Sequence, residues 1–282
     1  MGNNPQNSKK YLFEIRNEPL FVKEILKSIL ARQMLIGNIS TIPERFIWLA
    51  DNILTSTILP DYNGSLGEID LIAGLYVNGE PQTDLLIAVE VKYVNFKTPD
   101  ISDKNLPLHS GTGIPQTIAL KKMGFDYVWL VYFLVKPPTE GRRFWDWVDS
   151  GDFKNARERL LNIPWKDGEK LCVKTLEEGI GFLLLATGEV ALTGNDVGGS
   201  NHIEYCSHSF CNLFSNSKLN ASFGKVVKDA FDRSKTTLHP LRTGPLLLMK
   251  CSIKTCKKFF FTDALLTKKF EDKCPECRKT TI

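Results

Sequence analysis

The sequence lacks any apolar run long enough to cross a bilayer, and its N-terminus lacks the hydrophobic segment of a signal peptide. The first ten residues, MGNNPQNSKK, are polar and are expected to form a loose leader. These absences argue against a membrane-spanning or secreted protein. We therefore expect an intracellular protein, cytoplasmic or associated with the nucleoid, with no membrane partner.

The sequence also lacks the composition of a disordered chain, because 43% hydrophobic and 24% charged residues are ordinary globular values. Its 282 residues can bury a full core and leave room for one large domain and a small one. The formal net charge is only +4, and the positive excess lies in residues 250–282, which hold nine basic and four acidic side chains. This segment either contacts phosphate groups through electrostatics or is simply a solvated surface.

The most informative stretch runs from Gly67 to Lys92, from GEIDLIAG to LLIAVEVKYV. Asp70 lies near the start of one expected strand, and Glu90 and Lys92 share one face of the next, because they are two residues apart. The apolar residues before Glu90 predict a strand buried on both faces. Charges buried there cost several kcal/mol each, roughly, unless they have partners. A divalent cation such as magnesium would pair with the two carboxylates.

This pattern resembles the PD-(D/E)XK nuclease superfamily, with Asp70 as the aspartate and Glu90-Val91-Lys92 as the (D/E)-X-K tripeptide. The segment Gly67-Glu68-Ile69-Asp70 is similar to that of restriction-like and Holliday-junction-resolvase-like members. One departure is Ile69, where the family motif has proline. The resemblance covers roughly residues 20 to 135. It implies a restriction-endonuclease-like α/β fold, with a mixed central sheet flanked by helices, and phosphodiester hydrolysis that depends on Mg²⁺ or Mn²⁺.

The resemblance also implies a third acidic ligand on an early helix and a polar residue on a later one. Glu44 is the best placed acid by order, although Thr41 to Glu44 also reads as a capping box that explains it without metal. Glu24 and Glu68 remain alternatives. Gln116, in the first turn of the later helix, is the candidate for positioning a water or phosphate, and a surface glutamine is the competing interpretation.

Hydrophobic periodicity and turn residues predict the order helix, strand, strand, helix, strand that the superfamily core requires. A long loop is expected between the second strand and the following helix, as a mobile active-site flap. The expected elements are helices over 19–36, 42–54, 114–123 and 152–161, strands over 66–77, 126–135 and 181–186, a strand that begins at residue 85, and the loop over 97–112.

Seven cysteines in a chain without a secretion signal indicate metal ligands or free thiols rather than disulfides. Cys251-x4-Cys256 and Cys274-x2-Cys277 resemble a zinc ribbon, in which four thiolates close around a structural Zn²⁺. A second group, in the order His202, Cys206, His208, Cys211, is less regular. It either binds another metal or is a polar loop with incidental cysteines.

The domains expected are therefore a nuclease domain over 1–195, a connecting region over 196–246 and a zinc module over 247–282. The expected function is that of a Mg²⁺-dependent endonuclease whose zinc module helps bind nucleic acid, with DNA favoured over RNA by the resemblance alone. One alternative is a catalytically inactive nucleic-acid-binding or assembly protein with the same fold, and another is a zinc module that binds protein. A homodimer or a partner protein also stays open.

Overall fold

The computed structural model describes residues 15, 17–95, 112–135, 165–187, 204–213, 216–238, 244–264 and 272–279. The strands in these residues are β1 (Ile47–Leu54), β2 (Glu68–Val77), β3 (Glu80–Asn95), β4 (Tyr127–Val135), β5 (Gly181–Thr187), β6 (Glu204–Ser207), β7 (Leu246–Lys250) and β8 (Phe259–Asp263). The helices are α1 (Glu18–Lys27), α2 (Ile29–Ile39), α3 (Thr55–Ile58), α4 (Ile114–Met123), α7 (Trp165–Glu177), α8 (Ser217–Ser234) and α9 (Pro275–Lys279), with a 3₁₀ turn η2 over Glu44–Phe46.

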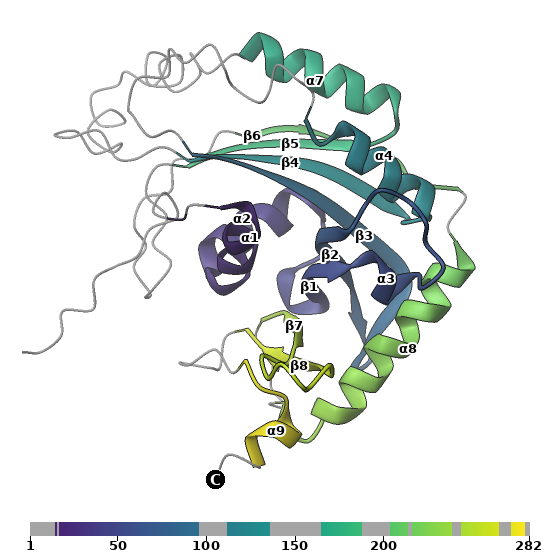
Figure 1. Cartoon of the computed structure of the whole chain (residues 1–282). Coiled ribbons are helices and arrows are strands. Elements are labelled where there is room, and N and C mark those ends of the chain that lie inside the picture. The colour runs from purple at the N-terminus through teal and green to yellow at the C-terminus, as the bar shows by residue number, and fades with distance from the viewer. Residues whose placement is uncertain are drawn as a thin grey trace, which may run out of the picture.

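The eight described strands form one mixed sheet in the order β6-β5-β4-β3-β2-β1-β7-β8 (Figure 1). β1, β2 and β3 pair antiparallel in sequence order, whereas β3, β4 and β5 are parallel. Parallel neighbours need a crossover, and α4 supplies it between β3 and β4. The prediction of an α/β protein with a mixed sheet flanked by helices is confirmed.

Helices cover both faces of this sheet (Figure 1), and the buried side chains divide into two corresponding cores. One core joins α4, α7 and α8 to the first face, and the other joins α1 and α2 to the second. Successive residues of a strand therefore alternate between the cores: Ala88 belongs to the first, and Val89 and Val91 to the second. Glu90 and Lys92 consequently lie on the face that α4 covers.

The prediction of a helix over 42–54 is wrong, because only Glu44–Phe46 forms a single 3₁₀ turn and β1 follows at once. No side chain caps that turn, so the capping-box interpretation of Thr41 is wrong as well. The run IWLADNIL is paired on both sides, with β2 and with β7. A run of this length and hydrophobicity fits a buried helix or a buried strand by pattern, and the sheet partners decided between them.

The predicted helix over 19–36 is confirmed in position but is two helices. Ser28 leaves the helical conformation, with φ −83° and ψ 114°, and its hydroxyl accepts a hydrogen bond from the Ala31 N–H at 3.3 Å. Serine favours this arrangement because its short side chain can replace the missing backbone acceptor. The second helix then continues past Gly37 to Ile39.

The connection between β2 and β3 is tighter than predicted, because β3 begins at Glu80 rather than at residue 85. Asn78 and Gly79 both have positive φ, 51° and 85°, which is the conformation of a two-residue hairpin turn. Pairing resumes at once, with Val77 opposite Glu80. The helix over 114–123 and the strands over 126–135 and 181–186 are confirmed within one residue at each end. The predicted helix over 152–161, and the loop up to residue 111, lie outside the described residues.

The cysteine-rich segment extends the main sheet. β7 pairs with β1 through Trp48 and Leu246, nearly two hundred residues apart in sequence, and β8 pairs with β7. The region expected as a connection contains α8, which packs on β8 and β3. The segment expected as a small module over 247–282 is thus continuous with the sheet that carries Asp70.

Candidate functional site

The candidate site begins where β2 and β3 separate. Their last backbone pair on this side is Leu71 with Val89. Beyond it the Val91 N–H donates to Asp70 Oδ2 at 2.8 Å, so a carboxylate takes the place of a backbone acceptor. This explains why an aspartate suits the position, because an unpaired N–H on a half-buried strand edge would cost free energy.

Glu90 and Lys92 point from β3 toward the same core face. The Lys92 ammonium lies 2.7 Å from Glu90 Oε1, and the Glu90 residue is only 4% exposed. The start of α4 closes over them: a Cβ added at Gly113, where φ is +98°, would lie 3.1 Å from Lys92 Cε. Glycine at this position therefore allows α4 to begin directly against the lysine.

A third acid joins this group from α1. Glu18, the first residue of that helix, accepts from Lys92 Nζ at 3.1 Å through Oε1 and from the Tyr93 N–H at 3.0 Å through Oε2. Asp70 and Glu18 thus accept from Val91 and Tyr93, alternate N–H groups along one edge of β3. Sequence reasoning missed Glu18, and its only local signal is an acid beside Pro19 in the first turn of a helix.

The acids suggested by sequence lie elsewhere. Glu44 pairs with Arg32, whose side chain is fully buried. Glu24 pairs with Lys27 on α1 at 2.8 Å, and Glu68 is exposed at the start of β2. Gln116 is half-buried in the first turn of α4, the helix that begins against Lys92, and its role stays a prediction.

The tyrosine beside Lys92 is a further polar neighbour. Tyr132 on β4 stands in register with Lys92, and its hydroxyl donates to the Thr112 carbonyl just before α4. Burial raises the pKa of Tyr132 to about 12, with the Lys92 charge opposing that rise. Tyr132 is therefore a neutral hydrogen-bond donor at neutral pH, and it fixes the segment that leads into α4.

Three carboxylates with one ammonium leave negative charge in a mostly buried place. Burial first, and then the charge of Glu90, raises the pKa of Asp70 to about 7. Burial also raises the pKa of Glu90, although Lys92 opposes it. The pKa of Lys92 is raised, because Glu90 and Glu18 outweigh the effect of its burial. Near neutral pH the Asp70 carboxyl is thus partly protonated, whereas the lysine is charged.

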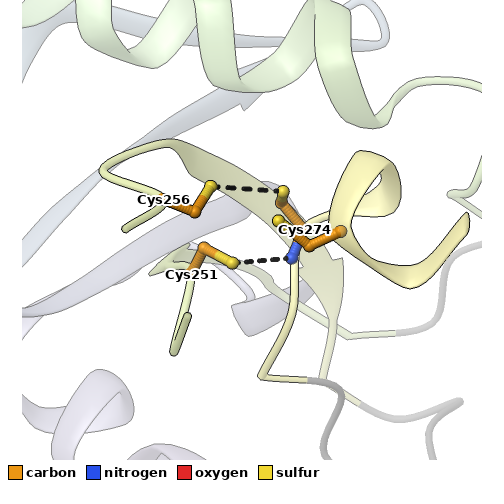
Figure 2. A group of neighbouring side chains, drawn as sticks. Cys251, Cys256 and Cys274 are labelled. Atoms are coloured by element: carbon orange, nitrogen blue, oxygen red, sulfur yellow. Dashed lines mark hydrogen bonds between the residues drawn. The ribbon is translucent and has the colours of Figure 1, made fainter. Parts of the chain in front are cut away.

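The described part of the chain holds one group of cysteine, histidine or acidic ligand atoms close enough together to bind a metal as they stand. It consists of Cys251, Cys256, Cys274 and Cys277, whose sulfur atoms all lie within 4.8 Å of one another (Figure 2). At the acidic group, Lys92 instead lies between Glu18 and Glu90 and pairs with both.

The cysteine spacing fits tetrahedral thiolate coordination. Cys256 Sγ and Cys274 Sγ are 3.7 Å apart, and the Cys274 N–H donates to Cys251 Sγ at 3.4 Å. Zn–S bonds of about 2.3 Å place neighbouring sulfurs about 3.8 Å apart in a tetrahedron, whereas a disulfide would need about 2.05 Å. The predicted metal-binding capacity of these four cysteines is confirmed in this coarse sense.

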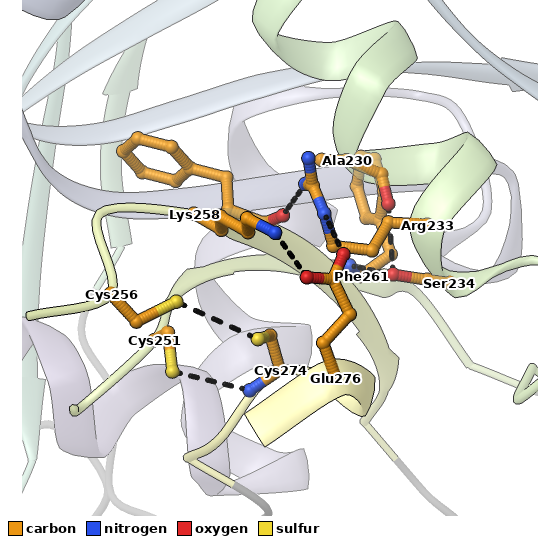
Figure 3. A network of polar contacts seen from close by, with 10 residues as sticks. Ala230, Arg233, Ser234, Cys251, Cys256, Lys258, Phe261, Cys274 and Glu276 are labelled. Atoms are coloured by element: carbon orange, nitrogen blue, oxygen red, sulfur yellow. Dashed lines mark hydrogen bonds and ion pairs between the residues drawn. The ribbon is translucent and has the colours of Figure 1, made fainter. Parts of the chain in front are cut away.

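Polar contacts tie the cysteine cluster to α8 (Figure 3). Glu276, between Cys274 and Cys277, pairs with Arg233 of α8 at 3.2 Å and also with Lys258. The Ser234 hydroxyl accepts from the Phe261 N–H at 2.8 Å and so joins α8 to β8. The segment with Cys274 and α9, which carries Cys277, is thereby fixed to α8.

The second cysteine–histidine group is not assembled in the described residues. His208 and Cys211 are both exposed, and neither belongs to a metal-binding cluster among those residues. His202, and the side chain of Cys206, lie outside the part that is described. The metal interpretation of this group stays a prediction.

Comparison of the chain with protein-family models, with curated proteins and with solved structures gave no match. Among the described helices, not one has both the length and the apolar character needed to cross a membrane.

The raised pKa of Asp70 predicts how stability changes with pH. Ionising Asp70 costs more in the fold than in the unfolded chain, so its contribution is complete below pH 4 and is lost as the pH rises through about 7. Without magnesium or manganese, Asp70→Asn is expected to be more stable than the wild type at pH 8, by about 2 kcal/mol, and similar at pH 4. Urea unfolding at several pH values measures this.

The matched control is Glu68→Gln, which removes an exposed acid two residues away on the same strand. That variant is expected to follow the wild-type pH dependence. If the wild type and Asp70→Asn show parallel curves between pH 4 and pH 8, the carboxyl of Asp70 does not carry the shifted proton.

Proposed function

We propose that this chain is a metal-dependent nuclease that hydrolyses phosphodiester bonds, with DNA as the favoured substrate. The observation that carries the proposal is the meeting of Glu18, Asp70, Glu90 and Lys92 at the point where β2 and β3 separate. The resemblance of Asp70 and Glu90-Val91-Lys92 to the PD-(D/E)XK motif supports the proposal. The contact between Asp70 and the Val91 N–H and the pair between Glu90 and Lys92 support it as well.

The acidic group suits Mg²⁺ or Mn²⁺ by its chemistry. Its donors are hard carboxylate oxygens, and three acids exceed the single lysine charge. Asp70 and Glu90 would hold the cation, and Glu18 would be the third acid of the site. The proton bound to Asp70 near neutral pH would be displaced when the cation binds. A bound cation would polarise the phosphate and lower the pKa of a coordinated water.

Lys92 is assigned an orienting role. Because Glu90 and Glu18 raise its pKa, the amine stays protonated and donates hydrogen bonds rather than removing a proton. A charged donor here would bind a phosphate oxygen and offset charge that develops on it. Gln116, at the start of the neighbouring α4, is the proposed polar contact to water or phosphate.

The order of elements supports the same proposal. The superfamily core requires helix, strand, strand, helix, strand, and the chain supplies α1, β2, β3, α4 and β4 in that order, with β3 and β4 adjacent and parallel. The restriction-endonuclease-like fold is therefore part of the proposal. β1, which precedes β2 in the chain, pairs with β2 on the side away from β3.

One observation favours the alternative of an inactive member of the fold. Lys92 pairs with both Glu18 and Glu90, at 3.1 and 2.7 Å, which gives these two carboxylates a cationic partner without a metal ion. A nucleic-acid-binding or assembly protein could retain such a network for stability alone. For the chain to act as a nuclease, Lys92 must release these two carboxylates when the cation and the phosphate bind.

A cleavage assay with the full chain separates the two functions. Labelled single- and double-stranded DNA and RNA are incubated with Mg²⁺, with Mn²⁺ or with neither. Cleavage that requires an added cation is expected, with the DNA substrates cut faster. Binding without cleavage under every condition would establish the inactive alternative, and binding that scarcely weakens with added salt would argue against phosphate contacts.

We also propose that the four cysteines hold a structural Zn²⁺. Four thiolates leave no open ligand position for water, and the sulfur spacing fits the ion. In this position zinc would join β7, β8 and α9. Its contribution to nucleic-acid binding would come from the lysines around it, one of which, Lys258, is already paired with Glu276.

A further inference from the structure

Asn52 has an unusual backbone conformation within a regular strand. Its φ is +47°, and it is one of two residues other than glycine with positive φ in the described chain. The other, Asn78, lies in the hairpin turn between β2 and β3, which requires that conformation. No turn accounts for Asn52, because β1 pairs with β2 on either side of it.

The pairing shows where this residue stands. Asp51 is opposite Leu71 and Ile53 is opposite Ile69, so Asn52 interrupts the ladder at the position that faces Asp70. The register is the same before and after, so no extra residue has been inserted. A left-handed conformation outside glycine costs about 1 kcal/mol or more, and a strand gains nothing from it by itself.

In this backbone conformation the side-chain amide of Asn52 donates two hydrogen bonds. Its Nδ2 donates to the Pro19 carbonyl at 3.3 Å and to Asp51 Oδ2 at 3.2 Å. Pro19 directly follows Glu18 in the first turn of α1. The amide oxygen of Asn52 is buried without a hydrogen-bond partner, which is a second cost to stability. Stability alone therefore does not explain this asparagine.

We propose that Asn52 is a positioning residue that holds the first turn of α1 so that Glu18 meets β3. Glu18 accepts from both the Lys92 ammonium and the Tyr93 N–H, so the start of α1 must be held in place against β3. A second contact holds α1 against β3, because the Tyr93 ring stacks on Phe21 of α1 with centroids 4.1 Å apart. Loss of the Asn52 amide would thus shift Glu18 without detaching α1.

The expected effect on cation binding rests on the proposed function, since a displaced Glu18 would weaken the cation site. Asn52→Gly tests it, because glycine accepts positive φ and removes only the amide. In the metal-free chain, amide exchange at Tyr93 is expected to become about tenfold faster, while exchange at Val91, held by Asp70, is unchanged. In zinc-saturated protein, the dissociation constant for Mn²⁺ is expected to rise about fivefold.

Asn78→Gly is the matched control, since it makes the same change in the turn, and it should alter neither measurement. In a Glu18→Ala background, Asn52→Gly should cause no additional loss of Mn²⁺ affinity, because the two residues act as one unit. Equal acceleration at Tyr93 and Val91, or an undiminished loss in that background, would overturn the proposal. Absence of Mn²⁺ binding in the wild type counts against the proposed function only, and the exchange pattern still decides the role of Asn52.

Discussion

Replacing Lys92 with methionine is expected to lower the single-turnover rate of cation-dependent cleavage by about a thousandfold. The loss of one positioned donor to a developing phosphate charge has roughly this effect in enzymes. Methionine retains the apolar stem that packs beside Gly113 and removes only the charge. Glu90 then loses the cation that opposes the rise of its pKa, so this carboxyl is expected to bind a proton more readily.

Folding must be separated from chemistry in this experiment. Circular dichroism and thermal unfolding report whether Lys92→Met retains the fold, and Lys92→Arg provides a second variant that keeps the charge. The matched control is Lys121→Met, which removes a lysine of α4 whose ammonium binds the Glu178 carbonyl. Lys121→Met is expected to cleave at the wild-type rate. Full activity in a folded Lys92→Met variant would rule out the assigned role of Lys92.

Replacing Cys274 with serine is expected to remove the bound zinc and to cost about 5 kcal/mol of unfolding free energy. Structural zinc sites supply about 10 kcal/mol or more in isolated small domains, and the sheet contacts of β7 would retain part of that here. Cys274 is fully buried, and its N–H binds Cys251 Sγ. In a chain of this size the melting temperature would fall by at least about 10 °C.

Zinc content measured by elemental analysis, together with thermal unfolding under reducing conditions, tests this expectation. Cys211→Ser is the matched control, because Cys211 is exposed and lies outside the cluster. One equivalent of zinc in the wild type and in Cys211→Ser, and none in Cys274→Ser, is the expected pattern. A wild type without zinc would refute the structural-metal proposal, and zinc lost from Cys211→Ser would instead establish the second metal group.

The two clusters differ in how far sequence could predict them. Asp70, Glu90 and Lys92 lie on strands joined by a hairpin, so alternation within each strand and antiparallel pairing were enough to bring them together. Glu18 is more than seventy residues from its partners on β3, and its place depends on how α1 packs across the sheet. Glu44 was the better candidate for the third acid by its position in the sequence, but it pairs with the buried Arg32.

The sequence by itself determined the elements whose causes are local: the Asn78-Gly79 turn, the helix between Gly113 and Gly124, the shared face of Glu90 and Lys92, and the spacing of the cysteines. Tertiary structure alone decided that β1 is a strand, that β7 joins it, and that Glu18 completes the acidic group. The physical reason is that pairing and packing between distant segments depend on which surfaces meet, and no short stretch of chain encodes that choice.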